Sequence, residues 1–205
     1  MIKNLFCGLI FITLSLPLVA ENHEGNSVNS DFKKAIKLVE NKNYFEAFEI
    51  FSNLAEDDVP EAQYNLSILY SNGLGAPKNY KSALYWVWQA YLNDHETAYK
   101  GFNAILELTN DDLRNTVATQ VIDELLLKAQ NGDKIAPLKL GKTYLSLFVE
   151  AQNQPAYLWL SISQAYGNES ASALLEEATS QLSLEEVLLQ QDKALVTFNE
   201  ITQKN

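Results

Sequence analysis

The stretch 60–92, PEAQYNLSILYSNGLGAPKNYKSALYWVWQAYL, decides the fold of this chain. Its apolar residues recur at intervals of three and four residues, the spacing of an amphipathic helix, first up to Tyr70 and again from Ala83 to Ala90. The segment 72–77, NGLGAP, ends the first helix, because glycine adopts the positive φ of a helix C-cap and proline cannot continue a helix. The sequence therefore predicts two antiparallel helices here.

Small and aromatic residues of this stretch recur 73 or 74 residues later: Ala62, Leu66, Tyr70, Ala83 and Trp86 are matched by Ala136, Leu140, Tyr144, Ala156 and Trp159. Alanines also recur at about half of that spacing, and those that begin successive units are Ala62, Ala98, Ala136 and Ala171. Helix-pair repeats stack with such a period. We therefore predict an all-α fold, a right-handed α/α solenoid of about five antiparallel helix pairs over residues 31–204.

Two units depart from the simple repeat. In the unit 97–130, the residues LTNDD at 108–112 replace the glycine loop, but the apolar pattern still predicts a helix pair. The last helix follows Ser183, with Glu186 three residues on, which is the pattern of a capping box. We expect this helix to have a polar outer face, because the end of a solenoid meets solvent.

The repeated unit resembles the Sel-one-like repeat (SLR) family, a group close to the tetratricopeptide repeats. The residues that carry the resemblance are Ala62, Leu66, Tyr70, Gly73, Gly75, Ala83, Trp86 and Ala90, followed by the later matches given above. Ser67 stands where the family prefers glycine, and Asn79 stands at its capping aspartate. Family members act mostly as adaptors in protein complexes, often in bacterial envelopes. The resemblance thus implies a non-enzymatic scaffold with a protein or peptide partner, and it assigns no chemistry.

The first 20 residues differ from the rest of the chain. Lys3 is their only charged residue, and an uncharged run from Leu5 leads to Ala20, which is typical of a secretory signal peptide. A retained membrane anchor is the alternative, although the run is short for a bilayer core of about 30 Å. With cleavage after Ala20 we expect a periplasmic or secreted protein with no integral membrane span.

The polar stretch 21–30, ENHEGNSVNS, is predicted to be a flexible leader, with the first helix capped by Asp31. Cleavage after Ala20 would expose Glu21-Asn22-His23, and an amine with histidine at the third position can bind Cu(II) or Ni(II) through nitrogen atoms. Coincidence is the other interpretation of this motif. Envelope metal binding or sensing through His23 is therefore the alternative function, and no cofactor is predicted.

Composition argues against several other functions. The net charge is −11 and Arg114 is the sole arginine, so a nucleic-acid partner is not expected. Cys7, the single cysteine, lies inside the signal segment. Hydrolase activity is attributed to cysteine-rich relatives, and it is the least favoured hypothesis here because those cysteines are absent. Asp94-His95-Glu96 is best explained as a polar turn.

The first helices of such pairs usually line the concave side of the solenoid. By register with the tetratricopeptide pattern, the resemblance implies a partner-binding groove lined by Tyr64, Ile68, Ser71, Lys100, Leu138, Lys142 and Leu145. Tyr64 and Ile68 would anchor a partner. The alternative is that Ile68 and Leu145 complete the packing between repeats.

The helix that contains Trp88 is apolar almost all round. Such a helix is either covered on both sides or exposes a contact surface. Trp88 is therefore also a candidate surface aromatic.

Overall fold

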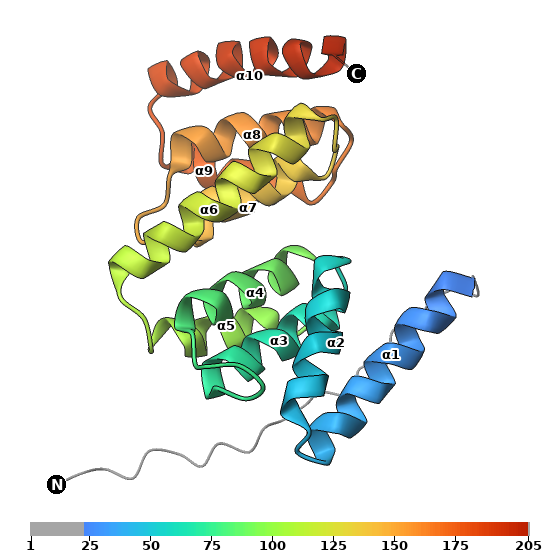
Figure 1. Cartoon of the computed structure of the whole chain (residues 1–205). Helices are drawn as coiled ribbons and strands as arrows, with labels where there is room; N and C mark the ends of the chain where they lie inside the picture. Colours follow the sequence, from blue (N-terminus) through green and yellow to red (C-terminus); the bar gives the residue numbers. More distant parts are fainter. Residues whose placement is uncertain (1–22, 205) are drawn as a thin grey trace, which may run out of the picture.

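The computed structural model describes residues 23–204, and this part of the chain folds into ten helices without a strand (Figure 1). The helices are α1 (His23–Glu40), α2 (Tyr44–Glu56), α3 (Pro60–Asn72), α4 (Tyr80–Leu92), α5 (Ala98–Leu106), α6 (Asp111–Gln130), α7 (Ala136–Ser146), α8 (Asn153–Ala165), α9 (Ala171–Ser180) and α10 (Leu184–Lys204). They stack as an α/α solenoid with α1 at one end and α10 at the other, which confirms the predicted fold class. The handedness of the solenoid stays a prediction. None of the helices described is long and apolar enough to cross a membrane.

The deciding stretch forms α3 and α4, which pack against each other. Pro60 occupies the first turn of α3, and Gly73 ends the helix with φ +71°. The Leu74 N–H then donates to the carbonyl oxygen of Leu69 at 3.0 Å, a Schellman-type ending. At the start of α4 the side chain of Asn79 accepts a hydrogen bond from the Ser82 N–H at 3.1 Å, so asparagine caps this helix.

Gly75 makes the loop between α3 and α4 fit against α2. Its φ is +77°, and a Cβ at this position would collide with the carbonyl oxygen of Tyr44 and the Cβ of Phe48. Only glycine combines this backbone conformation with so close an approach. The Gly-x-Gly signature thus specifies both the turn within one unit and the contact with the preceding one.

A residue with positive φ recurs four residues before each of the alanines that begin a unit. These residues are Asp58, Asp94, Gly132 and Gly167, which precede the buried alanines Ala62, Ala98, Ala136 and Ala171. Aspartate is one of the few residues other than glycine that adopts this conformation. The backbone therefore repeats with the period seen in the sequence, and at two turns it presents a carboxylate.

The apolar side chains form three successive cores. The first joins α1, α2 and α3, the second runs from α4 through α8 to α10, and the third joins α7, α8 and α9. Tyr70 packs against the first and second cores, and Tyr144 packs against the second and third. These two tyrosines are equivalent in the repeat, so each connects one core to the next.

The unit made of α5 and α6 is irregular. α6 packs against α4 and α7 and hardly touches α5, so residues 97–130 contain the two predicted helices but not a packed pair. Their connection lacks a glycine turn, and Asn110 starts α6 by accepting a hydrogen bond from the Leu113 N–H at 2.9 Å. α6 consequently runs as a long diagonal between the two halves of the stack (Figure 1).

The N-terminal boundary differs from the prediction. Residues 23–30 belong to α1, so the expected flexible leader is wrong over this range, and Asp31 lies inside the helix instead of capping it. Val28, one turn before Phe32, packs against the first core and extends its apolar stripe. The predicted signal peptide at 1–20 lies outside the described residues, as do Glu21 and Asn22 of the metal-binding motif.

The start of α10 has the predicted capping box. The Ser183 N–H donates to a carboxylate oxygen of Glu186 at 2.9 Å, and the Glu186 N–H donates to the Ser183 hydroxyl at 3.3 Å. These bonds to Ser183 hold the pKa of the Glu186 carboxyl below its ordinary value. The expected polar outer face is wrong, because several aliphatic side chains of α10 face solvent.

Candidate functional site

Four residues of the predicted groove lie on α3 and α5, two helices that contact each other. Tyr64 stacks on the His95 ring with 4.4 Å between ring centroids, and it lies against Gly101 of α5. Ile68 and Ser71 are half-buried, and Lys100 is exposed. These residues stay candidates for partner contact.

The groove does not continue to the residues predicted on α7. Leu138 and Leu145 are each only 8% exposed and belong to the third core, where α9 covers them, so they are not groove residues. The Lys142 ammonium pairs with Asp94 at 3.3 Å and lies over the Tyr91 ring. α5 and α7 hardly touch, so the residues predicted on α5 and α7 are not brought together by direct packing of these helices.

Trp88 is buried, which corrects its assignment as a surface aromatic. Its ring packs against Phe102 of α5, and its indole N–H donates to the Thr143 hydroxyl at 3.2 Å. α4 packs against α3 and α5, and α6 also lies across it. Of the two alternatives predicted for this apolar helix, the structure therefore shows the one in which it is covered on both sides.

His95 is buried and bonds to the backbone of its own turn. Its Nδ1 accepts a hydrogen bond from the Thr97 N–H at 3.3 Å, and burial lowers its pKa despite the nearby carboxylates of Glu61 and Glu96. In a Ser-His-Asp hydrolase Nδ1 would carry a proton and donate to the orienting carboxylate, but here it accepts from the backbone of its own turn. In the part of the chain described, no group of three or more His, Cys, Asp or Glu residues is placed to hold a metal ion.

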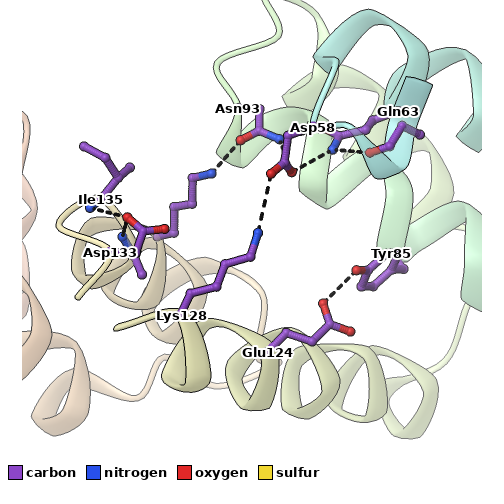
Figure 2. A network of polar contacts seen from close by, with 11 residues as sticks. Asp58, Gln63, Tyr85, Asn93, Glu124, Lys128, Asp133 and Ile135 are labelled. Carbon is purple, nitrogen blue, oxygen red and sulfur yellow. Dashed lines mark hydrogen bonds and ion pairs between the residues drawn. The ribbon is translucent and has the colours of Figure 1, made fainter. Parts of the chain in front are cut away.

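The strongest candidate site is a cleft between the end of α2, α4 and α6, with a volume of about 200 Å³. We call it the α4–α6 cleft, and its lining residues are Ala55, Glu56, Asp58, Gln63, Tyr85, Trp86, Gln89, Glu124 and Lys128. The cleft exists because α6 leaves α5 and crosses α4. Figure 2 shows its polar side chains converging from the two halves of the stack.

One wall of the cleft is a hydrogen-bond network around Asp58. The buried Gln63 donates to the Ala55 carbonyl oxygen at 3.1 Å and accepts from Asn93 at 2.9 Å. Asn93 also donates to Asp58 and accepts from the Lys139 ammonium. Burial lowers the pKa of Lys139. This network fixes the Asp58 turn against α4 and α7 (Figure 2).

The opposite wall belongs to α4 and α6. The Tyr85 hydroxyl donates to Glu124 at 2.7 Å, and Gln120 donates to the other oxygen of the same carboxylate at 3.1 Å. Burial, together with the bond to Glu124, raises the pKa of Tyr85. Glu124 is therefore held in place as an acceptor at the side of the cleft.

Lys128 spans the mouth of the cleft, 3.5 Å from Asp58. Both side chains are about half exposed, so this ion pair is weak and open to exchange. Three carboxylates, on Glu56, Asp58 and Glu124, line the cleft together with this one lysine. The arrangement favours a positively charged group beside the half-buried Trp86. Sequence reasoning missed this site, although the aspartate at the turn before Ala62 was its signal.

A comparison with known protein families agrees with the repeat seen in the structure. Residues 60–95 match the model of the Sel1 repeat family. This stretch is therefore similar to a Sel1 repeat. A similar solved structure is that of a Sel1 repeat protein from Oxalobacter formigenes, which is 19% identical over 84% of this chain and 89% of that chain, with a TM-score of 0.32. No protein with curated annotation matches the chain. The Sel1 repeat confirms the predicted family resemblance and supports a scaffold for protein interaction.

Proposed function

We propose that this protein is an exported, non-enzymatic scaffold that binds a protein or peptide partner in the cell envelope. The observation that carries the proposal is the match to a Sel1 repeat at 60–95, set in a stack of helices in which several large apolar side chains are exposed to solvent. The uncharged run from Leu5 to Ala20 supports export.

The position of contact is tested by photocrosslinking in native cells. Benzoylphenylalanine is placed at Glu56 beside the α4–α6 cleft, at Lys100 on α5, at Leu188 on α10, and at the exposed Lys33 on α1 as a control. A protein adduct at one or more of the first three positions, without the same adduct at Lys33, supports the scaffold. Absence of a protein adduct at all three positions overturns it.

Export is tested separately by fractionation and mass spectrometry of the chain purified from the same cells. We expect the protein outside the cytoplasm with Glu21 as its first residue. A variant with Leu9→Arg and Leu14→Arg interrupts the apolar run and is expected to remain in the cytoplasm at full length. Cytoplasmic, uncleaved wild-type protein contradicts the proposal.

A further inference from the structure

α10 has two different apolar faces. One face packs on α8 and buries Ala194 and Ile201. The other carries five solvent-exposed aliphatic side chains: Leu184 (75% exposed), Leu188 (52%), Leu189 (49%), Leu195 (62%) and Val196 (57%). In Figure 1 this helix is the outermost element of the stack, with α8 beneath it.

The exposed side chains are ordered along the helix. Leu184, Leu188 and Leu195 fall at intervals of four and seven residues and form one row, while Leu189 and Val196 form a second row beside it. The first row borders a groove of about 260 Å³ between α8 and α10, and its lining residues are Ser161, Ile162, Ala165, Ala194, Leu195 and Phe198. On the α8 side, Ser161 and Ala165 contribute small side chains to this groove. We call the two rows and this groove the α10 face.

Scattered exposed leucines need no explanation, but contiguous apolar rows mark a contact surface. The spacing of the first row is the spacing at which one helix packs along another. The α10 face is therefore suited to a helix.

The carboxylates between the two apolar rows of α10 indicate what kind of helix would bind there. Glu185 and Asp192 are exposed, seven residues apart, and by helical register they lie between the two apolar rows. Two α10 faces packed about a two-fold axis would bring these carboxylates together, in chains that each carry a net charge of −11. A helix with lysine or arginine beside its apolar stripe would instead pair with them.

We propose that the α10 face binds an amphipathic helix of a partner protein, whose apolar stripe is flanked by lysine or arginine. This inference rests on the proposed scaffold function and names the chemistry of one partner. The Leu184 row and the groove beside α8 receive the apolar stripe, and Glu185 and Asp192 pair with the basic side chains.

The test uses fluorescence anisotropy with labelled model peptides and the purified mature chain. The probe is a helical peptide with leucines at i, i+3, i+4 and i+7 and lysines elsewhere. A scrambled peptide of the same composition controls for attraction to an acidic protein, and a peptide with glutamate in place of lysine controls for the apolar stripe. We expect saturable 1:1 binding of the first peptide, and at least about tenfold weaker binding of the other two.

Variants locate the binding surface. Leu188→Gln with Leu195→Gln is expected to weaken binding about tenfold. The matched control, Phe45→Gln with Leu127→Gln, changes two equally exposed side chains on α2 and α6 and should leave the affinity unchanged. Glu185→Lys with Asp192→Lys should reverse the preference toward the glutamate peptide. Circular dichroism verifies that each variant is folded.

Three results overturn the proposal: equal binding of the scrambled peptide, equal loss in the control variant, or a wild-type dimer in sedimentation velocity that the Leu188→Gln, Leu195→Gln variant abolishes. The last result would make a second copy the occupant. If model-peptide binding fails while a native partner still crosslinks at Glu56 or Lys100, this inference falls and the scaffold function stands. If crosslinking also fails at all three positions, both fall.

Discussion

The units α3–α4 and α5–α6 begin with the same sequence plan but pack differently. The turn with Gly73 and Gly75 returns α4 along α3, whereas the glycine-free connection before α6 sends that helix away from α5 and across α4. The α4–α6 cleft lies where the second unit diverges. An intact repeat thus satisfies its own packing, and a degenerate one creates a polar surface with room for another molecule.

The largest effect is expected where one side chain joins both units. Trp88→Ala removes the ring that packs on Phe102 and bonds to Thr143, and we expect a loss of about 3–5 kcal/mol in the free energy of unfolding. Urea unfolding followed by circular dichroism measures it. Trp88→Phe keeps an aromatic ring and should lose less. A loss below about 1 kcal/mol for Trp88→Ala would contradict its role in the core.

The effect of replacing Gly75 in the intact unit can be compared with that of replacing Gly167, where a Cβ would have free space. Gly75→Ala should cost about 2–4 kcal/mol, because the new Cβ meets Tyr44 and Phe48 and the positive φ disfavours alanine. Gly167→Ala has the same backbone problem, but no atom lies within 4 Å of its Cβ, so we expect only about 1 kcal/mol. Equal losses in thermal or urea unfolding would show that the contact with α2 is unimportant.

Tyr85→Phe removes the hydrogen bond between α4 and α6 across the cleft, and we expect a loss of about 1 kcal/mol at neutral pH. The raised pKa of Tyr85 means that folding favours its neutral form. That contribution is complete below the ordinary tyrosine pKa of about 10 and is lost as the pH rises through the higher folded value. The variant should therefore lose stability less steeply above pH 10.

The control for this pH experiment is Tyr99→Phe, at an exposed ring. Burial also raises the pKa of Tyr91 and Tyr144, so part of the alkaline decline persists in every variant. Identical alkaline profiles for the wild type and Tyr85→Phe would contradict the bond to Glu124.

The smallest effect concerns His95, in the turn between the two units. Burial lowers its pKa, so folding favours the neutral ring. This contribution is present above the ordinary histidine pKa of about 6.5 and is lost as the pH falls through the lower folded value. Stability should thus decrease less between pH 7 and 5 in His95→Gln. Proton NMR should place the His95 midpoint below 6.5, and a higher midpoint would contradict its burial.

The intact unit could be predicted from the sequence because its signals are local. Pro60, Gly73 and Asn79 determine the ends of α3 and α4 within a few residues of themselves. The period of the alanines predicted the stack, and the capping box at Ser183 predicted the start of the last helix.

The errors concern which face of a helix is covered, and that depends on distant elements. Trp88 is buried against Phe102 of α5 and Thr143 of α7, and Leu145 is buried in the core that α9 completes. The α4–α6 cleft draws its walls from segments that are distant in the sequence, such as Asp58 and Lys128, which are 70 residues apart. Contacts between such distant segments cannot be predicted from a local sequence pattern. The aspartate at the turn before Ala62 was the one residue that pointed to this site.

The two equivalent tyrosines have a consequence for how the chain unfolds. Stacked repeats interact only with their neighbours, so each core could open alone unless adjacent cores share side chains. Tyr70 and Tyr144 are shared in this way. They therefore make unfolding cooperative, because opening one core removes contacts that the adjacent core also uses. A smaller residue at either position would let the ends of the molecule exchange amide hydrogens independently of its middle.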